Sequence, residues 1–359
     1  MFGKVREPDS LSKFELDEYL QFGWYRMGQS IFTCSFLNFK TEFYDAVWLR
    51  LDLSDFNTSS TFKKLERLNA KFQSKIGNAT ITAEKEALYA KYKTSISFET
   101  AISLQALLLD TEAESIFDTK EICIYDQSRL IAVGYFDMGH TSAAGIVSFF
   151  DPDYKKHSLG KYLIYNKIAY CQSIGLHYFY PGYFAPNYPL FDYKLSIGKQ
   201  AMEYFDICTN GWLPISQFDL EQAPLAETKA KLQLLYSLLN QQKMLAMVLK
   251  YEYYNANNIS HLKDLDLFDY PLFLMVQSPA FKDFFPIVVY DVIDKQYRLL
   301  KYYSVFHDEN YKSINNYYGE HLLKIAEVVF SSEDAQTIVG KLNSRNNIEV
   351  ISAQTLSVQ

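Results

Sequence analysis

The sequence predicts an α+β protein built from two or three packed units. Its 359 residues exceed the usual size of one domain, and 48% of them are apolar while 21% are charged, as in folded proteins. Short segments rich in β-branched and aromatic residues alternate along the chain with segments that repeat apolar residues at helical spacing. The mixture of these two patterns indicates sheets covered by helices.

The first 75 residues are expected to form a small N-terminal domain. The patterns predict a helix at 14–22 that ends near Gly23, strands at 31–39 and 46–53, and a helix at 62–72. The last helix places Phe62, Leu65 and Leu68 on one face. Its other face carries Lys63, Lys64, Arg67 and Lys71. Exposure to solvent and contact with a phosphate are about equally expected for these four positive charges.

Residues 76–215 are expected to form a second, larger domain. Helices are predicted at 83–97 and 101–110, a hairpin at 121–140, a strand from 142, a loop leading into a helix within 155–176, and a strand at 176–184. The hairpin turns at Asp126-Gln127-Ser128. The strand from 142 ends at Asp151-Pro152-Asp153, because proline cannot donate to a strand ladder.

Residues 216–359 read as an α+β extension. One long helix is predicted at 225–255, a pair of strands at 284–306, and a closing helix at 319–330. The tail after about 340 is polar.

Charge and cysteine usage limit the possible functions. The formal net charge of −7 disfavours extensive nucleic-acid binding, so any such contact should be local. Four cysteines, Cys34, Cys123, Cys171 and Cys208, lie far apart without a CxxC pair, so we expect no metal site and no cofactor. No apolar run approaches the length of a membrane span, and we expect a cytoplasmic chain without membrane contact.

The order hairpin, strand, glycine-containing loop, helix and strand resembles the core of Gcn5-related (GNAT) acyltransferases. That likeness implies an acyl donor held where two central strands splay, with donor phosphates near the helix N-terminus. In His157–Tyr162 one glycine fits the usual phosphate loop, but the bulky Tyr162 occupies a small-residue position. The loop is thus a weak cradle for the pyrophosphate of coenzyme A.

Two ordered blocks make the resemblance more specific. The first contains Phe150-Asp151-Pro152-Asp153, Ser158-Leu159-Gly160, Tyr180-Pro181-Gly182-Tyr183 and Tyr193-Lys194. The second contains Phe22 to Gly28, around Trp24 and Arg26, and Phe56 to Asn69. Together they resemble the arginyl-tRNA–protein transferase family and its bacterial leucyltransferase relatives over about residues 14–215.

This resemblance implies transfer of an amino acid, arginine or leucine, from the acceptor end of a charged tRNA to the N-terminal amine of a protein. Asp151, Ser158, Gly160 and Tyr183 are then the catalytic candidates, with Asp151 as general base or amine-orienting carboxylate. Turn capping is an equally good role for Asp151. Candidates for binding tRNA or substrate are Trp24, Arg26, Ser59, Lys63, Lys64, Arg67, Asn69, Tyr180, Tyr193 and Lys194.

The chain also departs from the family pattern. The family's clustered N-terminal cysteines are missing apart from Cys34, and Leu190-Phe191 replaces its Lys-Met. Two alternatives therefore stay open: an N-acyltransferase that uses acyl-CoA, and a catalytically silent interaction protein on the same fold. The donated amino acid, the accepting residue and the role of 216–359 are left open.

Overall fold

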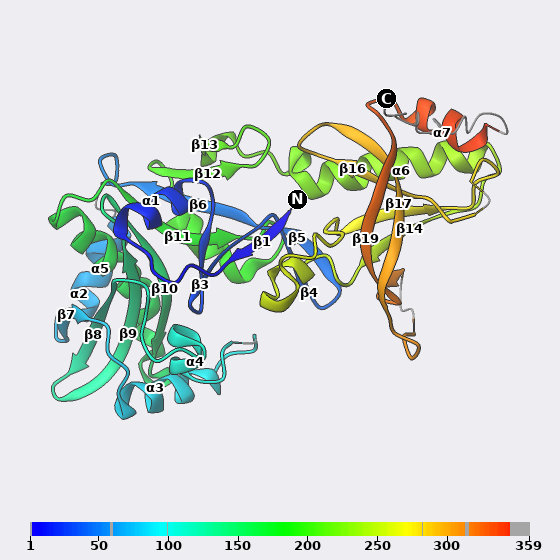
Figure 1. Cartoon of the computed structure of the whole chain (residues 1–359). Coiled ribbons are helices and arrows are strands. Elements are labelled where there is room, and N and C mark those ends of the chain that lie inside the picture. The colour runs from blue at the N-terminus through cyan, green and yellow to red at the C-terminus, as the bar shows by residue number, and fades with distance from the viewer. Residues whose placement is uncertain (1, 58–59, 99, 282, 313–315, 345–359) are drawn as a thin grey trace, which may run out of the picture. The chain divides into compact units, whose positions relative to one another are not determined.

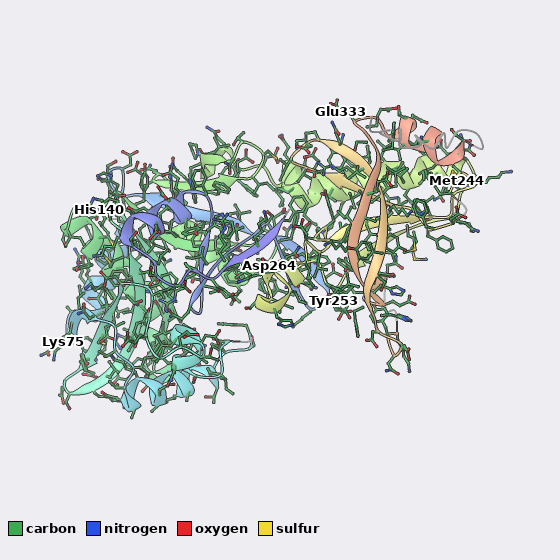
Figure 2. The ribbon with its side chains drawn as sticks, viewed as in Figure 1. Lys75, His140, Met244, Tyr253, Asp264 and Glu333 are labelled. Atoms are coloured by element: carbon green, nitrogen blue, oxygen red, sulfur yellow. The ribbon has the colours of Figure 1, made fainter. Side chains whose placement is uncertain are left out.

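The computed structural model describes residues 2–57, 60–98, 100–281, 283–312 and 316–344. The chain divides into two compact units (Figure 1). The first comprises residues up to 225 together with 255–264, and the second comprises 226–254 and the residues from 265 onward. Within each unit, side chains fill the space between helices and sheet (Figure 2).

The first unit is built on an eight-stranded sheet in the order β13-β12-β6-β11-β10-β9-β8-β7. The strands of this sheet are β6 (Val47–Asp52), β7 (Gln73–Asn78), β8 (Thr119–Asp126), β9 (Arg129–Met138), β10 (Ser142–Phe150), β11 (Tyr178–Phe184), β12 (Met202–Asp206) and β13 (Gly211–Pro214). Two small sheets are formed by β1 (Gly3–Arg6), β2 (Tyr25–Met27) and β3 (Ser30–Cys34), and by β4 (Phe36–Phe39) and β5 (Glu42–Asp45).

Helices cover both faces of the large sheet, because alternate strand residues point to opposite faces. The helices of this unit are α1 (Lys13–Gln21), α2 (Ser60–Asn69), α3 (Ala83–Lys93), α4 (Leu104–Leu109) and α5 (Leu159–Ser173), with 3-10 turns η1 (Pro152–His157) and η2 (Pro189–Ser196). On β8, Ile122 and Ile124 pack in one cluster with apolar residues of α2 and α5. Cys123, between them, packs with residues of α3 and α4.

The predicted acyltransferase order of elements is confirmed. β8 and β9 form the hairpin, with Asp126 paired to Arg129 across the expected turn. β10 follows antiparallel to β9, α5 crosses over, and β11 returns parallel to β10. The fold is therefore α+β with a GNAT-like core. β6, from within the predicted N-terminal domain, lies inside this same sheet, and the predicted boundaries near 75 and 215 stay predictions.

The second unit has a six-stranded sheet in the order β18-β14-β15-β16-β17-β19. Its strands are β14 (Ala246–Tyr251), β15 (Leu272–Val276), β16 (Ile287–Asp291), β17 (Gln296–His307), β18 (Tyr317–Tyr318) and β19 (His321–Ser332), and its helices are α6 (Pro224–Gln241) and α7 (Ala335–Asn343). Tyr297 OH of β17 donates to the Lys231 carbonyl of α6 at 3.0 Å.

Two helix predictions differ from the structure: the helix predicted at 319–330 is wrong, and the helix predicted at 225–255 is too long. Residues 319–330 form most of β19, which pairs with β17 from Tyr297↔Ser332 to His307↔His321. The helix predicted at 225–255 ends at Gln241, and Lys243 then adopts a positive φ of 60°. Residues 246–251 form β14, paired with β15. Both segments are apolar enough for a helix, and pairing with strands distant in sequence decides their structure. No helix among the described residues is long and apolar enough to cross a membrane.

Candidate functional site

The parallel strands β10 and β11 separate after a short stretch of pairing. Ser142, Ala143 and Ala144 face Tyr178, Phe179 and Tyr180, and no later pair follows in the ladder between these strands. Both strands are irregular at this point. β10 bulges between Gly145 and Val147 against β9, and β11 bulges between Phe179 and Gly182 against β6. We call the place where they separate the β10–β11 opening.

The residues of β11 explain its bulge. Pro181 has no N–H to donate to a neighbouring strand. Gly182 adopts φ +86°, a conformation that suits glycine and few other residues. The two residues therefore cannot continue a regular ladder, and the strand leaves β10 here.

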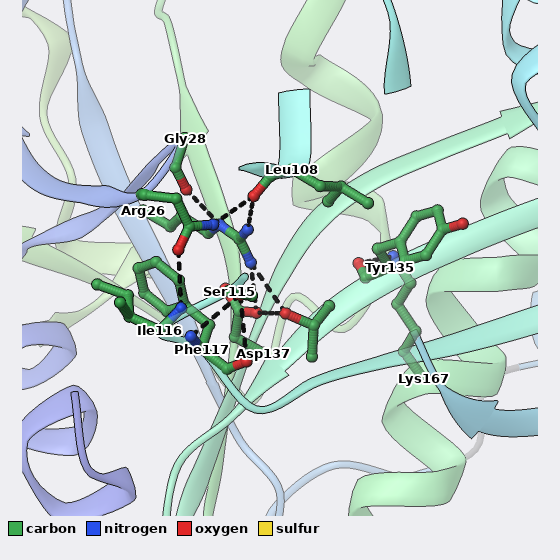
Figure 3. A network of polar contacts seen from close by, with 11 residues as sticks. Arg26, Gly28, Leu108, Ser115, Ile116, Phe117, Tyr135, Asp137 and Lys167 are labelled. Atoms are coloured by element: carbon green, nitrogen blue, oxygen red, sulfur yellow. Dashed lines mark hydrogen bonds and ion pairs between the residues drawn. The ribbon is translucent and has the colours of Figure 1, made fainter. Parts of the chain in front are cut away.

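A buried lysine stabilises the bulge of β10 through hydrogen bonds. The Nζ of Lys167, on α5, donates to the carbonyl of Tyr135 at 2.7 Å, to that of Val147 at 3.0 Å and to Ser148 Oγ at 3.1 Å. Figure 3 shows Lys167 beside Tyr135. The three acceptors match the three N–H bonds of an ammonium group. Burial lowers the pKa of Lys167 to about 7, and the neighbouring Cys171 and Asp137 oppose that shift.

Gly134 of β9 makes room for this lysine. A Cβ atom at Gly134 would lie 2.7 Å from Lys167 Cε, closer than carbon atoms approach without displacement. Sequence reasoning missed both residues. A signal was present, because Lys167 lies four residues from Leu163 and from Cys171, both on the apolar face of α5.

Asp151, at the end of β10, is held by cations and does not suit the role of a free base. The residue is 2% exposed, and its Oδ1 accepts from Lys91 Nζ at 2.6 Å and from the Asp153 N–H at 3.0 Å. Oδ2 accepts from Arg129. Burial alone would raise the pKa of Asp151, but these donors hold it below its ordinary value. The geometry fits the other predicted role, which is to fix the turn that leads into α5.

Ser158 and Gly160 lie at the N-terminus of α5. Ser158 takes a left-handed conformation with φ 49°, and its hydroxyl caps no amide of the helix. The first amides of a helix have no partner within it, and they carry the positive end of the helix dipole. Gly160 allows close packing on the end of β10, since its Cβ would lie 3.4 Å from Phe150. The N-terminus of α5 therefore has the charge character that favours an anion or a polarised oxygen.

Tyr180 and Tyr183 of β11 are packed by other aromatic rings. Tyr180 is 2% exposed, and its ring centre lies 5.5 Å from that of Trp212. The ring of Tyr183 lies 5.0 Å from Trp48 at 90°. Burial raises the pKa of each tyrosine to about 12. Tyr180 is too enclosed to stack on a base. Trp24 holds Arg6 above its ring at 4.8 Å.

Lys194, on η2, reaches the bulged segment of β11. Its Nζ donates to the Tyr183 carbonyl at 2.6 Å and lies 3.1 Å from where a Cβ of Gly182 would stand. The side chain is half-buried, and burial lowers the pKa of Lys194 to about 7. Its neighbour Tyr193 is 44% exposed. A cation that titrates near neutrality therefore lies beside the opening.

Arg26 is a buried structural residue, which does not fit its predicted role in binding tRNA. Nη1 donates to Asp137 Oδ1 and to Thr119 Oγ1, both at 2.9 Å. Nε donates to the Gly28 carbonyl at 2.7 Å, and Nη2 donates to the Leu108 carbonyl (Figure 3). The side chains of Arg26 and Asp137 are 5% and 1% exposed. This pair ties β2 to β9.

The predicted basic residues of α2 are exposed. Lys63, Lys64 and Arg67 face solvent, whereas Asn69 is fully buried and donates to the His157 carbonyl at 3.1 Å. That bond ties the end of α2 to η1, which carries the exposed Lys155 and Lys156. We call these exposed cations the basic face: Lys63, Lys64, Arg67, Lys155 and Lys156. Ser59 lies outside the described residues.

Comparisons with known proteins agree with the resemblance. Residues 84–203 match the family described as "Arginine-tRNA-protein transferase, C terminus". An aspartate/glutamate leucyltransferase of Leptospira interrogans is 30% identical over 193 residues, which cover 52% of this chain and 73% of that protein. Arginyl-tRNA–protein transferase 1 of Saccharomyces cerevisiae is 31% identical over 93 residues, which cover 26% of this chain and 18% of that protein.

The solved structures that resemble the chain match it only weakly. The C-terminal domain of a lysylphosphatidylglycerol synthetase from Agrobacterium fabrum matches with a TM-score of 0.36 and 12% identity. The match covers 44% of this chain and 58% of that one.

Proposed function

The chain belongs to the family of arginine-tRNA-protein transferases and aspartate/glutamate leucyltransferases, and from this premise we propose that it moves an amino acid from a charged tRNA to the N-terminal amine of a protein. The residues matched, 84–203, include the whole of β10, α5 and β11. The proposal therefore concerns the segment of the chain that contains the β10–β11 opening.

One observation carries the proposal: the separation of β10 and β11 beside the uncapped N-terminus of α5. Both strands are bulged at the opening, and the helix end offers amides to an oxygen or a phosphate. We propose that the 3′-terminal aminoacyl-adenosine lies there, with its ester at the β10 bulge and its phosphate near Ser158 and Gly160.

The reaction needs little chemical assistance. The nitrogen of the acceptor amine attacks the ester carbonyl, an amide bond forms, and the bond between the carbonyl carbon and the ribose oxygen breaks. The amine loses a proton and the ribose oxygen gains one. An α-amine with a pKa near 8 is partly neutral at neutral pH, so a strong base is dispensable. Positioning the amine and the ester can supply about 7–11 kcal/mol of the barrier.

Lys194 is proposed to recognise the acceptor. The Leptospira relative is named for aspartate and glutamate, and an acidic N-terminal side chain would meet the Lys194 ammonium beside the opening. The Asp151 carboxylate is occupied by Lys91 and Arg129, so we assign it to the turn and not to proton transfer.

The basic face is proposed to hold the acceptor stem. Lys63, Lys64 and Arg67 on α2 and two lysines on η1 gather positive charge on neighbouring elements, although the whole chain carries −7. Phosphates are bound by such local groups, and a short basic face suits a short length of backbone.

The test is a transfer assay with tRNAs charged with labelled leucine or arginine. Peptides beginning with Asp, Glu, Arg or Lys serve as acceptors, and the same peptides with an acetylated N-terminus serve as controls. We expect label in peptides with a free amine and an acidic first residue. Absence of label with every pair, together with acetyl transfer from acetyl-CoA, would replace the proposal by CoA-dependent acylation.

A further inference from the structure

Two histidines and a glutamate meet on the β17–β19 hairpin of the second unit. His307, at the end of β17, lies directly opposite His321, at the start of β19. Their imidazole rings stack with centres 4.4 Å apart at 24°. Glu320 immediately precedes β19. The ladder thus brings together two imidazoles and a carboxylate, and both kinds of group occur as zinc ligands.

The distances between the three side chains approach those of a metal site. Glu320 Oε1 lies 3.6 Å from His307 Nε2 and 3.7 Å from His321 Nε2. All three ligand atoms lie within 4.8 Å of one another. In a tetrahedral zinc site with bonds of about 2.0–2.2 Å, neighbouring ligand atoms are about 3.3–3.5 Å apart. Small rotations of these side chains would close the difference, since His307 and Glu320 are about half exposed.

An outer partner orients one imidazole. Ser304 Oγ lies 3.0 Å from Nδ1 of His321, on the side of the ring away from Glu320. β17 is irregular between Ser304 and Phe306, as the pairing with β19 shifts there. A hydrogen bond at one ring nitrogen leaves the other available to a metal, an arrangement that metal-binding histidines commonly use.

We propose that His307, Glu320 and His321 bind one Zn²⁺ ion, with water at the fourth position. Two imidazoles and a carboxylate favour zinc over magnesium or calcium, which prefer oxygen ligands alone. The ion would tie β17 to β19 at the end of the hairpin where the chain connects the two strands. This site is separate from the proposed transfer reaction, and its test does not depend on that reaction.

The experiment is calorimetric titration of the full chain with ZnCl₂ after treatment with a chelator and gel filtration, with MgCl₂ titrated in parallel. We expect one zinc ion per chain and no heat from magnesium. Ser304→Ala should weaken zinc binding about 10- to 100-fold, as loss of an outer partner does. His307→Ala and His321→Ala should weaken it further. His261→Ala, an exposed histidine of the first unit, is the matched control and should bind as the wild type does.

Two results would overturn the proposal. One is zinc binding of equal affinity in the wild type and in the His307→Ala/His321→Ala double variant. The other is no zinc binding by the wild type, which would leave the cluster as contacts between Glu320 and the two imidazoles without a metal. Circular dichroism and thermal unfolding without zinc establish that the variants fold, which we expect because His307 is exposed.

Discussion

The strands of the β10–β11 pair and of the β17–β19 pair all carry bulges, yet only the first pair opens. β17 and β19 shift register at three places and still pair along nearly their whole length. β10 and β11 pair at three positions and then separate. Bulges alone are therefore not sufficient to separate neighbouring strands. At the opening, Pro181 and Gly182 interrupt β11 while Lys167 fastens the bulged carbonyl of β10 from the side of α5.

The largest effect is expected from Lys167→Met, which keeps the apolar stem and removes the three donated hydrogen bonds. A buried carbonyl without a donor costs about 1–3 kcal/mol, so the free energy of unfolding should fall by at least that amount. Lys301, an exposed lysine at a bulge of β17, provides the control. Lys301→Met should change stability by about 0.5 kcal/mol or less in urea unfolding. Equal effects of the two variants would show that Lys167 stabilises its bulge no more than Lys301 stabilises the bulge of β17.

A second test fills the space that Lys167 occupies. Gly134→Ala would place a methyl group 2.7 Å from Lys167 Cε and should lower the free energy of unfolding by about 1–3 kcal/mol. Gly77, in the same sheet, has open space around its missing Cβ. If Gly134→Ala proves no more harmful than Gly77→Ala in urea unfolding, Lys167 does not need the room that we assign to it.

A third test concerns the charge of Lys194 beside the opening. Burial lowers the pKa of Lys194 to about 7, so its charge is present below that pH and is lost above it. The ratio of kcat/KM for a peptide beginning with Asp to that for one beginning with Asn should therefore decrease as pH rises through 7. Above the pKa the charged fraction falls about tenfold for each unit of pH.

The titration of the two acceptor amines is common to both enzymes, so it cancels when the ratio is compared between the wild type and Lys194→Met. Lys194→Met should lower the ratio and remove its decrease through pH 7. A wild-type ratio that stays constant between pH 6 and pH 9 would remove Lys194 from acceptor recognition.

The smallest effect concerns the basic face of the first unit. Lys63→Gln with Lys64→Gln should weaken tRNA binding and reduce the slope of log affinity against log salt by about 2. Lys301→Gln with Lys312→Gln removes two exposed charges from the other region and should leave the slope unchanged. Similar slopes in both double variants would mean that tRNA does not contact α2.

Local patterns were sufficient to predict the core of the first unit. The turn after Asp126, the stop at Pro152 and the amphipathic α5 each depend on residues close in sequence, and the structure has them where the sequence predicts them. The prediction of a helix at 319–330 failed because the segment LLKIAEVV suits a helix or a strand equally. Its partner strand β17 lies about twenty residues away in the sequence.

The candidate site was predictable in its location but not in its internal contacts. The family motifs lead to β10, α5 and β11, where the opening lies. They did not reveal that Arg26 pairs with Asp137, 111 residues away, or that Asp151 is paired with Lys91 and Arg129. Charged residues look free in a sequence, because their partners come from distant segments.

The most direct test of the proposed site is a crystal structure with a stable analogue of aminoacyl-adenosine in which an amide replaces the ester. We predict the analogue in the β10–β11 opening, with its carbonyl oxygen at the bulge beside Gly145 and its 5′ phosphate near Ser158 and Gly160. An analogue bound elsewhere on the chain, with the opening filled by side chains, would contradict this placement.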